Sequence, residues 1–389
     1  MGWVTRWVRG GWRPSKDPVR EPVVPPVNVS AIYVHPPGSF EREYPRVGDL
    51  KYGRENNPTV LGLEEALTSL EEARWTLAFN SGMAALSTLV LHEVARGAKK
   101  VLLERLTYGS TRSLLETLSS ITGVEVRLAG PPWEDLLDLV CWADLIIVES
   151  MANPTLRVPP LSGIYREAGS CGVRVVVDNT FATPIAYRPL ERGAHYSLES
   201  LTKYIAGHND VVGGSLSGRV EEDLEPLWNM RKILGTIMQP IDAYLAWRGM
   251  KTLKARFEAQ SRAAVEVAEW LESHRKVKKV YYPGLSSHPD HELARRELNG
   301  LYGAVVSFEI EGGREEVFKL LSRLKLVTPS PSFGGVETII SYPAISSHSN
   351  LDPLERSELG VTDGLLRLSV GLEDVSDVID DLSQALSAI

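Results

Sequence analysis

The chain has 389 residues, of which 43% are hydrophobic and 24% charged, and its formal net charge is −8. A chain of this length can bury a large core and can form two domains. Acidic and basic residues are interspersed rather than gathered in blocks, which argues against a nucleic-acid partner. No stretch approaches the roughly 18 apolar residues of a membrane span, and the N-terminus lacks an apolar signal segment. We therefore predict a cytoplasmic protein with no membrane contact.

The two cysteines, Cys141 and Cys171, lie in apolar or small-residue surroundings. Their spacing is not that of metal ligands, so we predict no metal site. We interpret both residues as reduced and structural, in keeping with cytosolic usage of cysteine.

The first fifty-odd residues are rich in proline, glycine and charge and lack a helical period. Such a segment predicts an extended arm over residues 1–55. An arm of this length is rarely left without a contact surface, so we expect it to lie on another part of the assembly.

Short apolar runs alternate with amphipathic helical patterns from residue 56 onward. Strands that are buried on both faces and separated by helices are typical of a parallel sheet in an α/β domain. Ligands of such sheets bind at the carboxyl ends of the strands. The runs that predict strands are 75–79, 99–104, 124–129, 144–150 and 173–179.

A long helical pattern over 239–274 leads into the last part of the chain, and its length predicts an interruption near Arg248 and Gly249. The remainder mixes two strand patterns with two helical ones. We therefore predict a large, mostly parallel sheet domain over 56–245 and a smaller α/β domain over 246–389.

The segment "SLESLTKYIAGHND" (197–210) contains Lys203, flanked by hydroxyl residues. Upstream, Asp178 ends a buried run, where an isolated carboxylate is costly unless it meets a positive partner. A protonated pyridine nitrogen is such a partner, and an aspartate beside a Schiff-base lysine is the recurring arrangement for pyridoxal phosphate.

Two further features fit the same cofactor. In "FNSGMAAL" a strand ends and a helix begins, so the free N–H groups of Gly82 and Met83 can hold a phosphate, with the hydroxyls of Ser200 and Thr202 as further donors. Tyr108 offers an aromatic face for the pyridine ring. Each feature alone has an ordinary structural explanation as a turn, a helix cap or packing. Their joint order along the chain favours pyridoxal phosphate.

The sequence resembles the pyridoxal-phosphate enzymes of cysteine and methionine metabolism, the group of cystathionine gamma-synthases and gamma-lyases. The resemblance implies the aspartate-aminotransferase-like fold (fold type I) and spans nearly the whole chain. The segments that carry it are "YGRENNPT" (52–59), "SGMAA" (81–85), "TYGST" (107–111), "ESMANP" (149–154), "VVVDNTFATP" (175–184), "SLTKYIAGHND" (200–210), "WRGMKTL" (247–253), "YYPGLSSHPDHELA" (281–294), "SFGGVET" (332–338) and "LRLSVGLED" (366–374).

The resemblance also implies roles for individual residues. Lys203 would carry the cofactor covalently and act in catalysis with Tyr108, whose ring would stack on the cofactor, while Asp178 would pair with the ring nitrogen. The implied phosphate ligands are Gly82, Met83, Ser200 and Thr202, joined by Tyr52 and Arg54 of a neighbouring subunit in a homotetramer, a dimer of dimers. The implied ligands of the substrate carboxylate are Arg367, Ser332 and Asn153.

The reaction itself is not fixed by fold and cofactor, because the family includes γ-replacement, γ-elimination and β-elimination. Many members have an acidic residue immediately before the serine of the "SFGG" motif, where this chain has Pro331. The segments "PSFGG", "GHNDV" and "RGMKTL" most resemble those of plant-type cystathionine gamma-synthases. We therefore predict γ-replacement of an activated homoserine by cysteine.

Other functions remain alternatives at this point. A cystathionine or methionine gamma-lyase and an O-acetylhomoserine sulfhydrylase would use the same residues. A non-catalytic scaffold would need no Schiff-base lysine, and a nicotinamide dehydrogenase is disfavoured because no G-x-G-x-x-G motif follows a strand.

Overall fold

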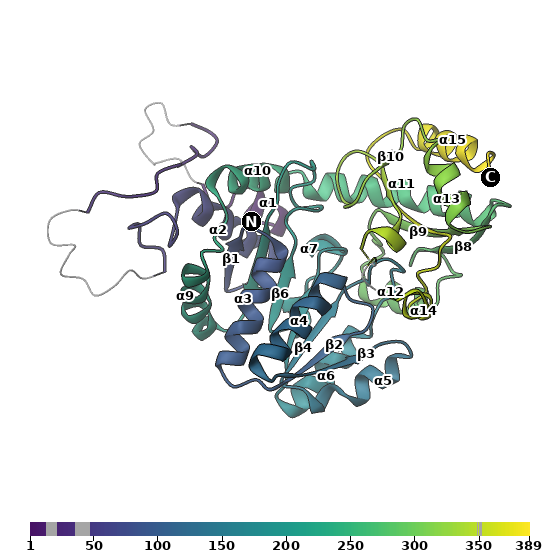
Figure 1. The fold of residues 1–389 in the computed structure, drawn as a ribbon. Coiled ribbons are helices and arrows are strands. Elements are labelled where there is room, and N and C mark those ends of the chain that lie inside the picture. The colour runs from purple at the N-terminus through teal and green to yellow at the C-terminus, as the bar shows by residue number, and fades with distance from the viewer. Residues whose placement is uncertain (13–21, 36–46, 348, 350–351) are drawn as a thin grey trace.

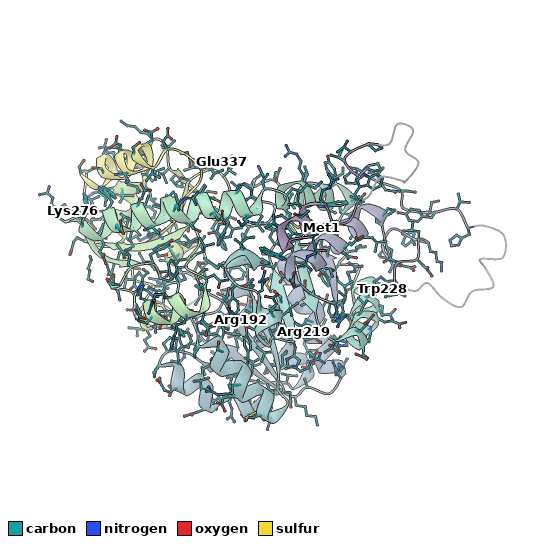
Figure 2. All side chains as sticks on the ribbon, turned by 180° about the vertical axis from the view of Figure 1, so that it is seen from behind. Met1, Arg192, Arg219, Trp228, Lys276 and Glu337 are labelled. Carbon is teal, nitrogen blue, oxygen red and sulfur yellow. A yellow bond between two sulfur atoms is a disulfide. The ribbon has the colours of Figure 1, made fainter. Side chains whose placement is uncertain are left out.

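The computed structural model describes residues 1–12, 22–35, 47–347, 349 and 352–389. Its described part contains a seven-stranded sheet and a five-stranded sheet, joined by one long helix (Figure 1). This arrangement agrees with the predicted large and small α/β units. Figure 2 shows the same two parts from behind, with Arg219 and Trp228 on the larger part and Lys276 and Glu337 on the smaller.

The larger sheet has the strand order β1-β7-β6-β5-β4-β2-β3. Only β7 runs antiparallel to its neighbours, so the sheet is mostly parallel, as predicted. In that order the strands are β1 (Trp75–Phe79), β7 (Gly214–Gly218), β6 (Tyr196–Glu199), β5 (Arg174–Asp178), β4 (Leu145–Glu149), β2 (Lys100–Glu104) and β3 (Glu125–Ala129).

All five predicted strands are present, but the sequence patterns missed β6 and β7. The strand β7 has the sequence GSLSG, which carries almost no strand signal of its own. Its small residues are required by close packing, because a Cβ at Gly218 would lie 2.2 Å from the Trp75 ring and one at Gly214 would lie 2.4 Å from the Ser81 carbonyl.

Helices cover both faces of the larger sheet (Figure 1). Alternate residues of one strand enter different cores: Ile146 and Val148 of β4 join one hydrophobic cluster, and Leu145 and Ile147 join the other. The helices of this part are α2 (Pro58–Glu71), α3 (Gly82–Ala95), α4 (Gly109–Thr122), α5 (Trp133–Asp138), α6 (Leu161–Cys171), α7 (Thr183–Ala186), α8 (Pro189–Arg192) and α9 (Leu224–Leu234).

The long helical pattern is divided into α10 (Pro240–Met250) and α11 (Leu253–Ser273), which confirms the predicted interruption. Gly249 has no room for a side chain, because a Cβ there would lie 2.1 Å from the Ala206 carbonyl oxygen. The Gly249 carbonyl accepts hydrogen bonds from the Thr252 hydroxyl and from Arg256. The break therefore fixes α10 against the turn that follows Lys203.

The smaller sheet has the order β10-β11-β12-β9-β8 and packs against α11, which in turn contacts α15. One hydrophobic cluster continues from the larger sheet through α11 into this part. Its elements are β8 (Val277–Tyr281), α12 (His291–Glu297), β9 (Val305–Ile310), α13 (Arg314–Leu321), β10 (Thr328–Pro329), β11 (Ile339–Ser341), α14 (Pro353–Glu358), β12 (Leu365–Ser369) and α15 (Val375–Leu386).

The first residues differ from the predicted extended arm. Residues 3–8 form α1 (Trp3–Val8), which packs on α2 with Trp7 fully buried. The Trp3 indole donates a hydrogen bond to the Leu70 carbonyl. Burial of the Trp7 ring and partial burial of the Trp3 ring stabilise a segment that is too short to be helical by itself. Residues 22–35 are extended and largely exposed, whereas 13–21 and 36–46 of the predicted arm lie outside the described residues.

The interpretation of the cysteines as reduced is wrong. A disulfide joins Cys141 to Cys171, with 5.7 Å between their Cα atoms. Cys141 lies in the short helix η2 (Val140–Trp142), which the fold places against the end of α6. This proximity is tertiary and left no signal in the spacing of the two residues. It also removes the argument for a cytoplasmic location that reduced cysteines had supplied.

Candidate active site

A cavity of ≈ 620 Å³ lies at the carboxyl ends of the parallel strands, between the two parts of the chain. Its walls come from strand ends, from the first turn of α3, from the loop after β6 and from the smaller part. Residues predicted for the site that line it are Gly82, Met83, Tyr108, Asn153, Asp178, Ser200, Thr202, Lys203, Ser332 and Arg367. The fold therefore brings together ten of the twelve predicted site residues.

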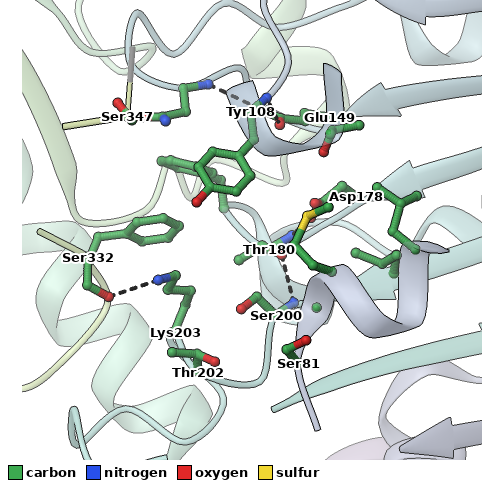
Figure 3. A pocket seen from close by; sticks show the side chains of 18 of the residues that line it. Ser81, Tyr108, Glu149, Asp178, Thr180, Ser200, Thr202, Lys203, Ser332 and Ser347 are labelled. Atoms are coloured by element: carbon green, nitrogen blue, oxygen red, sulfur yellow. Dashed lines mark hydrogen bonds between the residues drawn. The ribbon is translucent and has the colours of Figure 1, made fainter. Parts of the chain in front are cut away.

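Lys203 lies in the turn that follows β6, and its side chain points into the cavity (Figure 3). Its Nζ donates a hydrogen bond of 2.9 Å to the Ser332 hydroxyl and lies 5.3 Å from the centre of the Phe333 ring. Burial, and then the positive charge of Arg367, lower the pKa of Lys203 to about 8, and Asp178 acts in the opposite direction. A substantial fraction of this amine is consequently neutral near physiological pH.

Asp178 is the last residue of β5 and borders the same cavity. Its Oδ1 accepts hydrogen bonds from the Thr180 amide at 3.1 Å and from the Thr180 hydroxyl at 2.5 Å. The Ser200 amide in turn donates to the Thr180 hydroxyl at 2.8 Å (Figure 3). Burial raises the pKa of Asp178, while Thr180 and Lys203 act in the opposite direction. This carboxyl is oriented and partly desolvated, so a cationic ligand would stabilise its charge.

The N-terminus of α3 points at the loop that carries Lys203. Ser81 caps the helix by accepting a hydrogen bond from the Ala84 amide at 3.0 Å. Gly82 and Met83 occupy the first two helical positions, whose N–H groups have no partner within a helix. A Cβ at Gly82 would lie 3.2 Å from the Ser200 Cβ, so glycine lets the helix end approach Ser200 closely. Together these donors form a site for an anion.

The hydroxyl of Thr202 is engaged with the protein itself. It donates to the Gly213 carbonyl at 3.2 Å and accepts from the Gly213 amide at 3.0 Å. Thr202 still borders the cavity, so its contact with an anion would compete with or add to these bonds.

Tyr108 is the residue before the first turn of α4, and its ring lies across the cavity from Lys203 (Figure 3). Tyr108 is 41% exposed, so its ring is accessible to a ligand in the cavity. On the facing wall Phe333 stacks on Phe181, with 4.1 Å between the ring centres. The cavity therefore offers aromatic faces on two sides.

Arg367 is the central residue of β12 and is only 6% exposed. Its Nη1 donates to the Asn153 Oδ1 at 2.7 Å and its Nη2 to the Ser332 carbonyl at 2.8 Å. Ser332 has a φ of +87°, a conformation uncommon for a residue with a side chain. Burial lowers the pKa of Arg367 to about 10. Its Nε is buried and has no acceptor among the described residues, so the guanidinium has a free donor.

Two predicted residues do not border the cavity of their own chain. Tyr52 is 41% exposed, and Arg54 donates a hydrogen bond of 2.6 Å to the Lys232 carbonyl. The guanidinium of Arg54 lies 5.4 Å from the centre of the Tyr52 ring. Their prediction as contacts to a second subunit stays a prediction.

The comparisons with known proteins decide the family. The model of the Cys/Met metabolism PLP-dependent enzymes matches residues 5–387. The chain belongs to this family. It is consequently an enzyme, and its cofactor is pyridoxal phosphate.

Similar proteins within this family carry several different names. The chain is 36% identical to a cystathionine beta-lyase of Coxiella burnetii, covering 98% of this chain and 97% of the relative. It is 39% identical to the chloroplastic cystathionine gamma-synthase 1 of Arabidopsis thaliana, covering 98% and 68%. A structure of cystathionine gamma-synthase from Xanthomonas oryzae pv. oryzae, in complex with aminoacrylate and cysteine, has 34% identity and a TM-score of 0.90, covering 100% and 98%.

The residues present fit pyridoxal phosphate. The buried Lys203 amine, the strand-end carboxyl of Asp178 and the free N–H groups of α3 match its aldehyde, ring nitrogen and phosphate in chemical character. The free Nε of Arg367 matches a carboxylate acceptor. In the part of the chain that the structure describes, no group of three metal-ligating side chains and no helix suited to cross a membrane was found.

Sequence reasoning missed several residues of this enzyme's cavity, chiefly Glu149, Thr180 and Phe333. Glu149 ends a buried strand in the same way as Asp178, so the signal that found Asp178 was also present there. Phe333 comes from a loop between two short strands, and only the tertiary fold reveals that it faces Lys203.

Proposed function

We propose that this enzyme catalyses γ-replacement: a homoserine whose hydroxyl is esterified reacts with cysteine to give cystathionine and the free acid of the ester. The Cγ–O bond of the ester breaks and a Cγ–S bond forms, with the thiol proton balancing the released acid. Both substrates are amino acids, and a cavity of ≈ 620 Å³ has room for the two together.

Pro331 lies on the cavity wall, at the position where many members of the family have an acidic residue. Proline has neither a charge nor an N–H, so this position supplies no counter-charge to the distal ammonium of cystathionine. The carboxylates that border the cavity, Glu149 and Asp178, both lie at strand ends. The distal ammonium is that of the incoming cysteine, so the absence of an acid bears on a synthase and a lyase alike. Support for synthesis comes from the segments "PSFGG", "GHNDV" and "RGMKTL", which are most like those of plant-type cystathionine gamma-synthases.

Pyridoxal phosphate, when bound, supplies an aldehyde that condenses with amines and a ring that withdraws electrons from the substrate Cα. Lys203 would hold the cofactor until the substrate amine replaces it. The freed Nζ then accepts the Cα proton, which its lowered pKa allows. The same amine can deliver a proton to the departing ester oxygen.

The other cavity residues would orient the two partners. Asp178 would keep the ring nitrogen protonated, and Tyr108 would stack on the ring and accept a proton from the substrate ammonium. Gly82, Met83 and Ser200 would bind the phosphate, with Thr202 beside them. These proposals rest on the strand-end position of Asp178 and the open N-terminus of α3.

Arg367 would bind the substrate α-carboxylate. Its planar guanidinium suits two parallel hydrogen bonds to a carboxylate. The Asn153 Oδ1 and the Ser332 carbonyl each accept from one terminal nitrogen, which leaves the Nε–H and the second hydrogen of each terminal nitrogen for a carboxylate. Asn153 and Ser332 thus act as supports of this clamp.

We further propose that Tyr52 and Arg54 reach the phosphate of a second subunit in a dimer of dimers. Support comes from their position outside their own cavity. Mixing inactive Lys203→Ala subunits with inactive Arg54→Ala subunits should restore part of the activity in hybrids, because one site per dimer would be complete. Hybrids that stay inactive, verified by mass, would contradict a shared site.

A single assay tests the reaction. The holoenzyme is incubated with O-succinyl-, O-acetyl- and O-phosphohomoserine, each alone, with cysteine or with sulfide, and cystathionine, homocysteine and 2-oxobutyrate are quantified. We expect cystathionine to be the main product with at least one ester. Oxobutyrate that forms at the same rate with and without cysteine would instead indicate a γ-lyase. Homocysteine formed from sulfide, with cysteine ignored, would indicate a sulfhydrylase.

A further inference from the structure

Glu149 is a carboxyl that contacts both sides of the proposed substrate site. It ends β4, borders the cavity and is only 4% exposed. Figure 3 shows it beside Tyr108. The proposed reaction does not use it as an acid or a base, so its conspicuous burial needs another explanation.

The two oxygens of Glu149 accept hydrogen bonds from two different loops. Oε1 accepts from the Tyr108 amide at 2.7 Å and from the Thr107 hydroxyl at 3.0 Å. Oε2 accepts from the Asn153 amide at 3.2 Å. One carboxyl therefore connects the residue that carries the exposed aromatic ring with the residue that supports Arg367.

The connection continues to Arg367 through a single side chain. The backbone N–H of Asn153 is held by Glu149, and the side-chain Oδ1 of Asn153 accepts a hydrogen bond from Arg367 Nη1 at 2.7 Å. Displacement of the Asn153 backbone would therefore move the acceptor that holds the guanidinium. On the other side, displacement of the Tyr108 amide would turn its ring, because that amide lies at the start of α4.

The chemistry of these contacts requires a group that only accepts. All three partners of Glu149 are N–H or O–H donors, and a carboxyl can accept on both oxygens. Burial, and the nearby carboxyls of Asp178 and Glu104, raise the pKa of Glu149, whereas the hydrogen bonds from the backbone amides of Tyr108 and Asn153 lower it. These hydrogen bonds therefore favour the charged form, which accepts on both oxygens.

We propose that Glu149 is a positioning residue that fixes the Tyr108 ring and the Asn153–Arg367 pair relative to each other. The inference rests on the proposed roles of Tyr108 and Arg367. It adds that both depend on one shared anchor, so that a change at Glu149 disturbs ring stacking and carboxylate binding together.

The test variant is Glu149→Gln, which keeps the size of the side chain but replaces one acceptor oxygen by a donor. One of the two loops then faces an NH₂ group instead of an oxygen. An unsatisfied buried contact of this kind corresponds to about a 5–150-fold change. We expect kcat/KM to decrease by a factor in that range. The dissociation constant of an unreactive amino acid such as 2-aminobutyrate should rise, and the visible circular dichroism of the bound cofactor should change.

Two comparisons separate positioning from a general loss of structure. Glu71→Gln makes the same change at a fully buried glutamate of α2 that does not border the cavity, and it should leave all three measurements unchanged. In a double-mutant cycle, Glu149→Gln should weaken 2-aminobutyrate binding much less when Asn153 is already alanine, because the side chain that transmits the effect is gone.

Binding and dichroism do not depend on which ester is the substrate, so they test this inference even if the proposed reaction is wrong. Unchanged binding and dichroism in folded Glu149→Gln would overturn it, and so would full additivity with Asn153→Ala. If Glu149→Gln does not fold, Thr107→Val removes one donor to the same carboxyl at nearly constant volume. That variant should change the dichroism by a smaller amount, and an unchanged signal would equally overturn the proposal.

Discussion

The two ends of the central strands both hold buried charged groups, but they neutralise them differently. At the amino end, Arg174 pairs with Asp223 and lies 3.6 Å from Glu93, and Arg96 binds Asp223 at 2.8 Å. The hydroxyl oxygen of Tyr196 lies 2.8 Å from the Glu93 carboxyl and 2.9 Å from the Asp223 carboxyl, and its one hydrogen is donated between them. Each acid at this end meets a base, so the cluster is complete without a ligand.

At the carboxyl end, four consecutive strands of the sheet each finish on an acid: Glu104, Glu149, Asp178 and Glu199. Among the described residues, none of the four has a lysine or arginine within ion-pair distance. Burial raises the pKa of all four carboxyls. The positive groups nearby, Lys203 and Arg367, face the cavity instead.

The difference teaches how to distinguish a structural charge cluster from a functional one. A cluster that neutralises itself holds elements together, and its removal affects folding. A cluster that lacks counter-charges can receive them from a ligand, here at the two carboxyls that border the cavity, Glu149 and Asp178. The following predictions test whether the two ends of the sheet really divide in this way.

The largest effect is expected for Lys203→Ala. Loss of the amine should lower kcat/KM by about 10³-fold or more, since covalent attachment and proton transfer are both lost. Borohydride treatment of the wild-type holoenzyme should fix a pyridoxyl group on the peptide that contains Lys203. The matched control is Lys251→Ala, since burial also lowers the pKa of Lys251, but this residue does not border the cavity. A label on another lysine would contradict the assignment.

A large effect of a different kind is expected at the amino end. Arg174→Met would leave Asp223 and Glu93 buried with fewer partners, which should lower the free energy of unfolding by about 3–5 kcal/mol. Urea unfolding measures this change, and kcat/KM of the folded enzyme should stay within about twofold. The control is Arg127→Met, because the exposed Arg127–Glu125 pair should contribute only about 0–1 kcal/mol. Strong inactivation of folded Arg174→Met would contradict the view that the charged groups at the amino end are structural only.

Arg367→Lys should have an intermediate effect, confined to function. Lysine keeps the charge but not the two parallel hydrogen bonds, and loss of such a buried pair costs about 2–5 kcal/mol in transition-state binding. The visible spectrum of the bound cofactor and the unfolding midpoint should not change. If kcat/KM stays near normal with every homoserine ester, the carboxylate binds elsewhere.

The smallest effect concerns the pH at which Lys203 reacts. Only the neutral amine attacks an aldehyde, so the initial rate at which pyridoxal is trapped on the apoenzyme should rise with pH through a midpoint of about 8. The negative charge of Asp178 raises the pKa of Lys203, so Asp178→Asn should move this midpoint to lower pH. A midpoint near that of an ordinary lysine, or a shift to higher pH in the variant, would contradict the electrostatic description of the site.

The sequence by itself determined the class of fold and predicted ten of the residues that border the cavity. Five apolar runs predicted strands that are present, because residues buried on both faces of a parallel sheet must be apolar in succession. Asp178 and Gly82 were recognisable because a strand end and a helix start are local features. Arg367 was predicted from the motif that carries the family resemblance, since an arginine in the middle of a strand would otherwise be read as a surface charge.

The tertiary structure decided what depends on contacts between distant segments. The strand β7 has small residues because Trp75 and Ser81 leave no room for larger ones, and α1 is stabilised because Trp7 is buried where α1 packs on α2. The pairing of Cys141 with Cys171 follows from the packing of η2 against α6. Glu149 was visible as another strand-end acid, but only its hydrogen bonds to two loops give it a specific part in the site. Local patterns record burial and backbone preference, whereas the partner of a side chain is set by the whole fold.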